Sequence, residues 1–412
     1  MKKLSMLFIT FLTVPFLSAP LAAQDGGWRM PNRGFEIGLA HTSFGFSNDF
    51  LSAADIFQET AVIDIDKLKN GFNLHLDAGI TPFYIQYNNT NDNWGFGFSL
   101  NASFTGILGL NGSMITFAQA TDARSDVGGA AFIDANMNIY FPISKLKVRI
   151  APSVFYPAAF ITAVPNKPII SYTNNALNGE TLFNLNYNLR VYTPFQLDSF
   201  DLANFNFANL NGEPGVDVNL GLEFPLGDAL GWTKGSHLLD FTIGLDVYNL
   251  PLLNARLDEY IEVSGQIGSD NPIDIFSDGI GGLLDPKKLI ITDSGKESVG
   301  ILRPFKMLLW AQWQPFGPFL SFTPIAGFSI NPFYIEQFSL EYGIKARLDL
   351  GNIFIVTYGT GYYDRFWKNS LDIALNLRLI EINLGVDLRS PDFLKSWQGS
   401  GLGVNVGIKL GW

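Results

Sequence analysis

The last twelve residues of the chain, GLGVNVGIKLGW, alternate strictly between apolar residues and residues that are polar or lack a side chain. Glycine, asparagine and lysine separate the apolar positions, which are Leu402, Val404, Val406, Ile408, Leu410 and Trp412. A period of two places these six side chains on one face of a β-strand. Such a strand is stable only where that face is buried or meets hydrocarbon.

The same alternation recurs along the chain and predicts sixteen strands. They are 35–46, 71–87, 94–104, 127–141, 145–155, 180–192, 215–226, 237–248, 255–264, 303–314, 318–330, 336–350, 352–362, 370–379, 380–389 and 401–412. Several reach about ten residues or more, the length at which a tilted strand crosses a bilayer. The alternation is poorest in 255–264.

The polar face of these strands is rich in Asn, Gly and Asp, which suits a crowded or hydrated barrel interior. A soluble β-sandwich is the alternative, but its strands would be shorter and its polar face richer in Lys, Glu and Thr. Bacterial single-chain barrels have even strand numbers. We therefore expect an all-β fold, a transmembrane antiparallel β-barrel of 14 or 16 strands.

Composition agrees with this fold. Charged residues are only 16% of the chain, against about 25% in soluble domains. Beyond the first residues no apolar run reaches about 18 residues, so the sequence predicts no transmembrane helix. Residues 1–23 have two lysines, an apolar stretch and a small-residue end, which indicates a signal peptide and leaves 24–412 as the barrel. Without those lysines the formal charge falls from −11 to −13, which argues against a nucleic-acid partner.

Connection lengths give a topology. The connections 47–70, 105–126, 156–179, 265–302 and 390–400 are long, whereas 142–144, 249–254, 315–317 and 351 are short, which fits long extracellular loops and short periplasmic turns. The segment 193–214 is the exception, since it should be a short turn but runs to about twenty residues. Either a pair of strands is missed there or this segment folds into the mouth of the barrel. Within the first long loop, 49–59 (DFLSAADIFQE) has an N-capping Asp49 and an apolar face, which predict a short helix.

Motifs for catalysis or metal binding are weak. The chain has no cysteine and three histidines that are far apart in sequence: His41, His75 and His237. It also has no G-x-S-x-G motif. Two acidic segments, SDNPIDIFSDG and VIDID, could bind calcium weakly or be solvated loops, and the first has carboxylates every four residues rather than at the spacing of a calcium loop. We expect no enzymatic activity, no metal and no cofactor, and His75 as a hydrogen-bonded residue of the barrel interior.

Charged residues on the polar face are the more specific signal. They are Arg190, Asp217, Glu223, Asp240, Asp246, Glu341, Lys345, Arg347, Asp349, Asp372, Arg378, Glu381, Asp387, Arg389 and Lys409. Charges inside a barrel must be paired or hydrated, because an isolated buried ion costs several kcal/mol. They form either an ion-pair lattice that braces the wall or a constriction that selects solutes by charge.

Aromatic residues near the predicted strand ends suggest girdles at the lipid–water boundary. They are Trp94, Trp310, Trp313, Tyr362, Tyr363, Trp367, Trp397 and Trp412.

The chain resembles a bacterial outer-membrane β-barrel protein in its predicted signal peptide, its alternating strands and its terminal Trp412. The segments FGFSNDFLSAADIF, DIDKL, FNLHLDAGI and WGFGFSLNA are similar to uncharacterised barrel families of spirochaetes and Bacteroidetes. The chain lacks the Asn-Pro-Ala motif and the long N-terminal plug of the long-chain fatty-acid channels. The resemblance implies the outer membrane of a diderm bacterium, with Trp412 as part of the signal read by the barrel-assembly machinery. It also implies contact with outer-membrane lipid.

Two functions are compatible with this sequence. One is a porin-like channel or transporter for a small solute. The other is a non-conducting surface protein, adhesin or structural, that acts through the loops 105–126, 156–179 and 265–302.

Overall fold

A computed structural model describes residues 33–48, 72–89, 93–110, 126–165, 167, 170–177, 180–194, 211–233, 237–269, 289–334, 337–397 and 399–412. The predicted signal peptide, the predicted helix at 49–59 and the acidic segments lie outside these residues.

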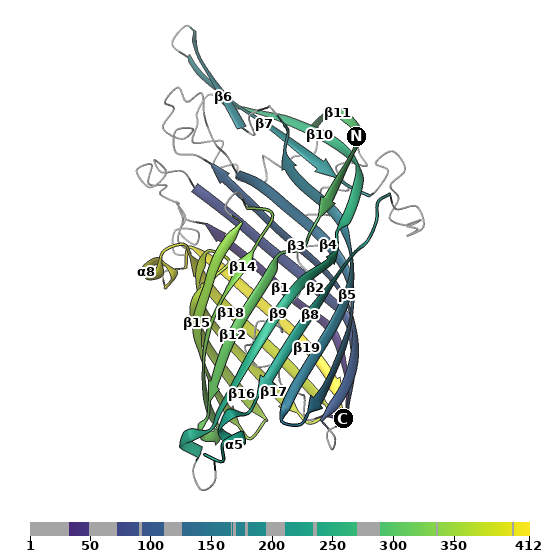
Figure 1. The fold of residues 1–412 in the computed structure, drawn as a ribbon. Coiled ribbons are helices and arrows are strands. Elements are labelled where there is room, and N and C mark those ends of the chain that lie inside the picture. The colour runs from purple at the N-terminus through teal and green to yellow at the C-terminus, as the bar shows by residue number, and fades with distance from the viewer. Residues whose placement is uncertain are drawn as a thin grey trace.

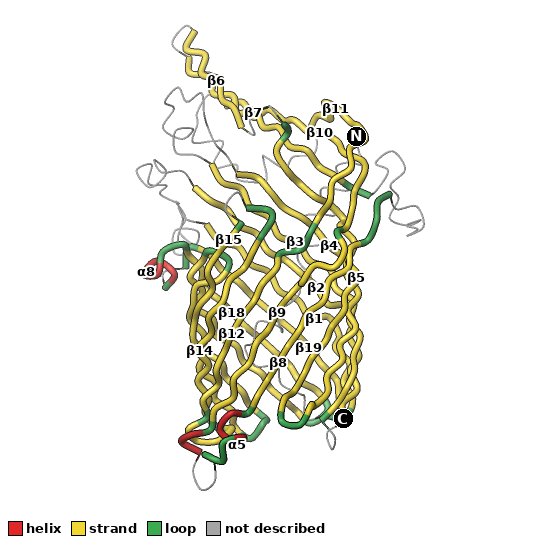
Figure 2. Tube along the Cα trace, viewed as in Figure 1, coloured by secondary structure: helices red, strands yellow, loops and turns green. Residues whose placement is uncertain are grey.

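The described residues form a closed antiparallel barrel of fourteen strands (Figures 1 and 2). In order around the wall they are β1 (Phe35–Asn48), β2 (Phe72–Asn89), β3 (Trp94–Leu110), β4 (Asp126–Ile143), β5 (Leu146–Ala163), β8 (Gly215–Phe224), β9 (Phe241–Leu253), β12 (Phe305–Trp313), β14 (Leu320–Ile330), β15 (Phe338–Leu350), β16 (Phe354–Tyr363), β17 (Phe366–Leu377), β18 (Ile380–Ser390) and β19 (Gly401–Gly411). Pairing of β19 with β1, from Glu36↔Gly411 to Ser47↔Gly401, closes the wall.

The four remaining long strands form an extension above one side of the wall, as Figure 1 shows. They are β6 (Ile170–Leu177), β7 (Glu180–Tyr192), β10 (Ala255–Ser269) and β11 (Leu289–Ile301). β7 pairs with β6, with β10 and with the upper end of β5, while β11 pairs with β10. The predicted strands 180–192 and 255–264 therefore exist, but neither belongs to the barrel.

The position of β7 and β10 outside the wall explains why the segment 193–214 is too long for a short turn. β5 and β8 are adjacent in the wall, paired from Lys147↔Glu223 to Phe155↔Gly215, so all of 164–214 is one long connection. The prediction that 249–254 is a periplasmic turn is wrong, because β9 continues to Leu253 at the loop end and the chain runs on into β10 without turning. The pair Val216↔Leu253 and the bridge Glu213↔Arg256 have the same register. The strands β6 and β11 were also missed, since they lie within segments that were predicted to be loops.

One end of the barrel carries the C-terminus and short turns, and we call it the turn end. Its larger connections contain α5 (Leu226–Ala229), η5 (His237–Leu239) and β13 (Pro315–Pro318). The opposite loop end carries the long connections and α8 (Phe393–Ser396), for which Asp392 accepts hydrogen bonds from the amides of Leu394 and Lys395. None of the described helices is long and apolar enough to cross a membrane.

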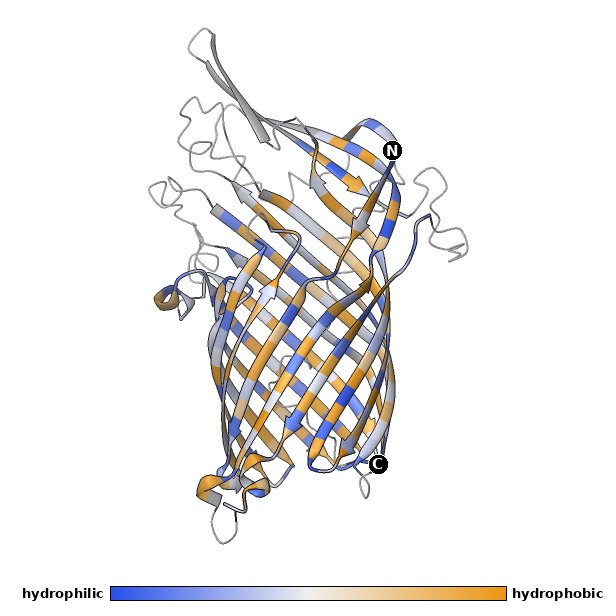
Figure 3. Cartoon of the chain, in the orientation of Figure 1, coloured by the Kyte–Doolittle hydropathy of each residue, from blue (hydrophilic) through white to orange (hydrophobic). Residues whose placement is uncertain are grey.

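Apolar and polar residues alternate around the wall (Figure 3). Large apolar side chains point outward and remain exposed, for example Phe96 at 53%, Leu309 at 59% and Leu340 at 60%. In β19, Val404 and Ile408 are exposed on the outer face, whereas Gly403 and Gly407 are buried. The outer surface is therefore a continuous apolar belt of the kind that faces lipid.

Candidate functional site

The inward face of the wall is where ionisable side chains gather. Twelve of the predicted interior charges lie on it: Asp217, Glu223, Asp246, Glu341, Lys345, Arg347, Asp349, Asp372, Glu381, Asp387, Arg389 and Lys409. Asp217 and Glu341 are each only 1% exposed. His75 is also buried, and its Nδ1 lies 3.5 Å from a carboxylate oxygen of Asp77.

Three predicted interior charges lie elsewhere. Arg190 belongs to β7 in the extension and not to the wall. Arg378 is an exposed turn residue between β17 and β18, with a positive φ of 48°. Asp240 precedes β9 at the turn end, where its backbone carbonyl accepts a hydrogen bond from the Gln314 amide. Period-two spacing did not distinguish these positions, because it does not show where a barrel strand ends.

In the extension, Arg190 and Glu262 form a buried ion pair that also contacts two half-exposed side chains. Its guanidinium lies 2.7 Å from Glu262 and 2.5 Å from Glu297, and it stacks 4.1 Å from the centre of the Tyr260 ring. Lys167 adds a contact of 2.8 Å to Glu262. These charges join β7, β10 and β11 and hold the extension together.

We expect acid to loosen the extension. The hydrogen bond from Lys167, opposed by burial and reinforced by Arg190, lowers the pKa of Glu262 below its ordinary value of 4.5. A carboxylate with a lowered pKa in the folded state stabilises that state above its unfolded pKa, and the stabilisation is lost as the pH falls through the folded pKa. Amide hydrogen exchange of β7 and β10, corrected for intrinsic rates, should therefore accelerate below about pH 4.

Glu262→Gln should abolish this pH step, whereas Glu213→Gln should leave it in place. Glu213 pairs with Arg256 at 3.6 Å, but both side chains are more than half exposed, and such pairs contribute little. Unchanged exchange of the wild-type extension between pH 7 and pH 3 would contradict this account.

Arg389 bridges the seam where the barrel closes. Its guanidinium contacts Asp77 of β2 and Asp387 of β18, and it is 6% exposed. Asp387, Gly403, Gly45 and Asp77 lie in one row across four strands. A Cβ at Gly45 would lie 2.1 Å from Nη1 of Arg389, and a Cβ at Gly403 would lie 2.1 Å from Asp387. The two glycines therefore leave the space in which the arginine reaches across β19 and β1.

Other rows show the same arrangement, in which an inward glycine leaves space for a side chain from a neighbouring strand. Arg149, Gly221 and Asp246 lie in register, and the guanidinium lies 3.7 Å from the carboxylate. The indole of Trp310 lies over Gly244 and donates a 2.9 Å hydrogen bond to Asp246. Inward glycines thus allow charged or aromatic side chains to reach over an intervening strand.

Two further clusters lie toward the loop end. Lys306 contacts Glu341 at 3.2 Å and Asp364 at 3.1 Å, and Lys368 contacts the same Asp364 at 3.3 Å. Arg303, in the connection from β11 to β12, contacts Asp217 at 2.6 Å and Asp134 at 3.0 Å. The arginine also lies 4.9 Å from the centre of the Phe155 ring.

Three further ion pairs join side chains of the same strand or of adjacent strands. Lys147 lies 2.7 Å from Glu223, Lys409 lies 3.3 Å from Glu381, and Arg347 lies 3.4 Å from Asp349. Asp372 accepts a 3.0 Å hydrogen bond from Asn405. The described interior therefore matches the ion-pair lattice more closely than a ring of one charge.

Sequence reasoning missed several members of this lattice. Asp77, Asp134, Arg149, Lys306 and Lys368 occupy inward positions of barrel strands, and their alternation with apolar neighbours could have identified them. Arg303 lies in no strand, and only the folded connection brings it to Asp217. Among the described residues, no group of three or more His, Asp and Glu is arranged to hold a metal ion.

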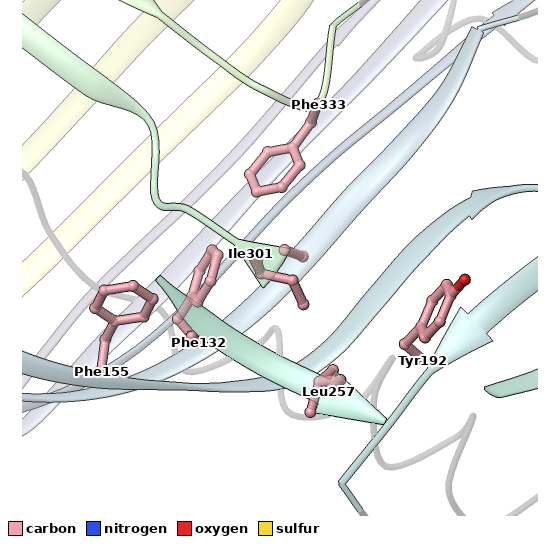
Figure 4. Packing of buried hydrophobic residues seen from close by; sticks show 8 residues of the cluster. Phe132, Phe155, Tyr192, Leu257, Ile301 and Phe333 are labelled. Carbon is pink, nitrogen blue, oxygen red and sulfur yellow. The ribbon is translucent and has the colours of Figure 1, made fainter. Parts of the chain in front are cut away.

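The connection between β14 and β15 contacts distant strands at the loop end. Phe333 lies 6.1 Å from the ring of Phe132 on β4 and 6.0 Å from that of Phe160 on β5, four to six places around the wall from its own strands. Figure 4 shows it above Phe132 and Ile301, in a buried apolar cluster that also contains Leu257.

The next residue of this connection points to another part of the wall. Tyr334 lies 6.4 Å from the ring of His75 on β2 and 4.9 Å from the guanidinium of Arg365. Phe333 and Tyr334 are 8% and 6% exposed, respectively. Phe333 and Tyr334 thus connect three parts of the rim, and we call them the mouth pair.

The predicted aromatic girdle is correct only in part. Trp94, Trp313, Trp397 and Trp412 are exposed outward-facing or rim residues. Trp310 is 3% exposed and faces the interior, so its assignment to the girdle was wrong. Tyr363 also faces inward, where a Cβ at Gly343 would lie 2.3 Å from its hydroxyl.

Comparison with known proteins gives only an architectural likeness. No family model and no curated protein matches the sequence. Solved structures that are similar include the Pseudomonas putida toluene transporter TodX, with 10% identity, coverage of 93% of this chain and 91% of that one, and a TM-score of 0.48. The translocator domain of the Neisseria meningitidis autotransporter NalP has 8% identity, coverage of 99% and 98%, and a TM-score of 0.34. We therefore base the function on the geometry of this chain.

Proposed function

We propose that this protein is an outer-membrane channel or transporter for a small polar solute. The carrying observation is the two-faced wall, which is apolar outside and lined inside by charges of both signs. Fourteen strands lie between the small barrels that side chains fill and the larger porins that enclose an aqueous channel. Because the interior charges are paired, we expect selection by polarity and size more than by the sign of the solute's charge.

Planar-bilayer recording of the purified, folded protein tests this proposal. We expect discrete conductance steps whose size scales with the conductivity of the bathing salt. Correct folding is checked by heat-modifiable migration in SDS gels. A folded barrel that carries no current, even with the mouth pair removed, would overturn the proposal.

A second candidate function, a non-conducting surface protein, would act through the extension. The hairpin of β6 and β7 projects well beyond the wall in Figure 1, where it is accessible to a partner. Deletion of 164–179 separates the two functions, because a channel should keep its current whereas an adhesin should lose its binding to cells.

We also propose that Trp412 is part of the signal for barrel assembly. Its ring lies 4.9 Å from that of Phe35 and is 67% exposed, and the backbones of these two residues exchange hydrogen bonds of 3.1 Å. Exposure leaves the ring available to an assembly factor before the seam closes.

Trp412→Ala should reduce the folded barrel recovered from the outer membrane of a diderm host several-fold. Spontaneous refolding of the same variant into vesicles should be almost unchanged, since an exposed ring adds little stability. Trp397→Ala is the matched control, because that indole is 52% exposed but not terminal. Equal recovery of the two variants would contradict an assembly role.

A further inference from the structure

The outer face of the wall contains a groove of about 380 Å³ near the turn end. Phe241 of β9, Ala311 and Trp313 of β12, Phe322 and Pro324 of β14, and Ile344 of β15 line it. All six are outward positions of their strands, within the apolar belt. Ile243, Leu309 and Leu340, exposed by 39%, 59% and 60%, continue this belt around the groove.

The pairing of β12 with β14 is interrupted beneath the groove. β12 and β14 are paired from Phe305↔Ile330 to Trp310↔Ile325 and again at Trp313↔Phe322, with no pairing of Ala311 and Gln312 to Pro324 and Thr323. The register is the same on both sides of this gap, so the pairing is interrupted without a bulge. Pro324 has no N–H to donate, which accounts for an interruption at this position. β14 stays paired with β15 through Pro324↔Ile344.

The rings at the edge of the groove are held in place. The Trp313 indole stacks on Phe241 at 6.1 Å with 10° between the planes, and it lies 5.8 Å from the ring of Phe322. Its Nε1 donates a 3.0 Å hydrogen bond to the carbonyl of Leu238 in η5. Ala311, which lies level with Pro324 in the register of β12 and β14, contributes only a methyl group to the lining. The groove is therefore a preformed, narrow apolar depression.

We propose that the groove binds one acyl chain of a phospholipid in the leaflet at the turn end. The groove is continuous with the lipid-facing belt, and its lining offers carbon surface only, so the fitting occupant is a hydrocarbon chain. Between a protein surface and lipid tails the gain comes from van der Waals contact, since both are equally apolar. A depression with several walls gives one chain more contacts than the flat wall does, and that chain should exchange more slowly than its neighbours. This inference depends on the proposed membrane location and not on the proposed transport.

Photocrosslinking in vesicles tests the proposal. The full chain is reconstituted into phosphatidylcholine vesicles that contain a trace of phosphatidylcholine with a diazirine in its acyl chain, and adducts are mapped by mass spectrometry after irradiation. We expect adducts on β12 and β14 around Ala311 and Pro324 to exceed, several-fold for equal exposed area, those on the outward face of β3 and β4.

The key variant is Ala311→Phe, which fills the groove and should reduce these adducts to the level of the flat wall. Ala135→Phe is the matched control. Ala135 is an outward residue of β4 between Ile133 and Met137, which are 39% and 51% exposed. This control should leave the adducts unchanged. Should Ala311→Phe not fold, Ala311→Leu makes the same test with less bulk.

Equal labelling of the two faces, or labelling that Ala311→Phe does not reduce, would show ordinary lipid contact only and would overturn the groove site. Absence of adducts on both faces of a correctly folded barrel would instead overturn its membrane location.

Discussion

Replacing Arg389 with leucine should destabilise the barrel by about 3 kcal/mol or more. The substitution leaves Asp77 and Asp387 without the guanidinium that lies between them. Removing one partner of a buried ion pair is costly because the remaining charge stays desolvated. Arg389 also connects β18 to β2 across the seam between the first and last strands, so its loss removes the only side-chain bridge that the described residues show at that row.

Urea unfolding in vesicles, followed by tryptophan fluorescence and by heat-modifiable migration, measures this effect. Adding Asp77→Asn to Arg389→Leu should recover part of the loss, since one of the two unpaired carboxylates is then neutral. Arg378→Asn is the control, because Arg378 is an exposed turn residue whose positive φ asparagine tolerates; we expect a change of less than about 0.5 kcal/mol. Equal effects of Arg389→Leu and Arg378→Asn would show that the seam does not depend on this bridge.

Removing the mouth pair, by Phe333→Ala and Tyr334→Ala together, should raise the single-channel conductance several-fold. Phe333 packs into the apolar cluster of β4, β5 and the extension, whereas Tyr334 lies against His75 of β2. Together they place two large rings across the entrance to a charged interior. Replacing both rings with methyl groups widens this entrance without altering the wall.

Phe338→Ala is the matched control for the mouth pair. Phe338 follows the same connection at the start of β15, but its ring is 57% exposed on the outer face. Its loss should leave conductance unchanged. Swelling of solute-loaded vesicles gives a second measurement, in which the double variant should admit small sugars faster than the wild type. Unchanged conductance and swelling in the double variant would show that the mouth pair does not limit passage.

Alternation predicted the barrel wall well because a two-residue period has a direct physical meaning. In β19, each outward residue from Leu402 to Leu410 meets a nonpolar surrounding and each inward one meets the interior, as the sequence alone indicates. The same reasoning fails at Trp310. Its strand reads FKMLLWAQW, with five apolar residues in succession from Met307 to Ala311, so the pattern does not assign a face. Only closure of the sheet puts Trp310 inside, over Gly244.

Sequence reasoning likewise left the number of strands in the wall undecided. β7 and β10 contain strand patterns, yet they pair with each other and with the upper end of β5 rather than joining the ring. Strand length and alternation indicate that a segment forms a strand, but they do not indicate which other strand it pairs with. The predicted topology therefore left 193–214 unexplained, and the adjacency of β5 and β8 explains it.

The sequence by itself determined the two faces of the wall wherever apolar and polar residues alternate, because successive side chains of a strand point to opposite faces. Tertiary structure alone decided the fourteen-strand closure, the bridge from Arg389 to Asp77 and the place of Phe333 and Tyr334 in the mouth. Residues 77 and 389 are far apart in the chain and meet only after the last strand pairs with the first. Contacts of this kind depend on which strands become neighbours, and local patterns do not contain that information.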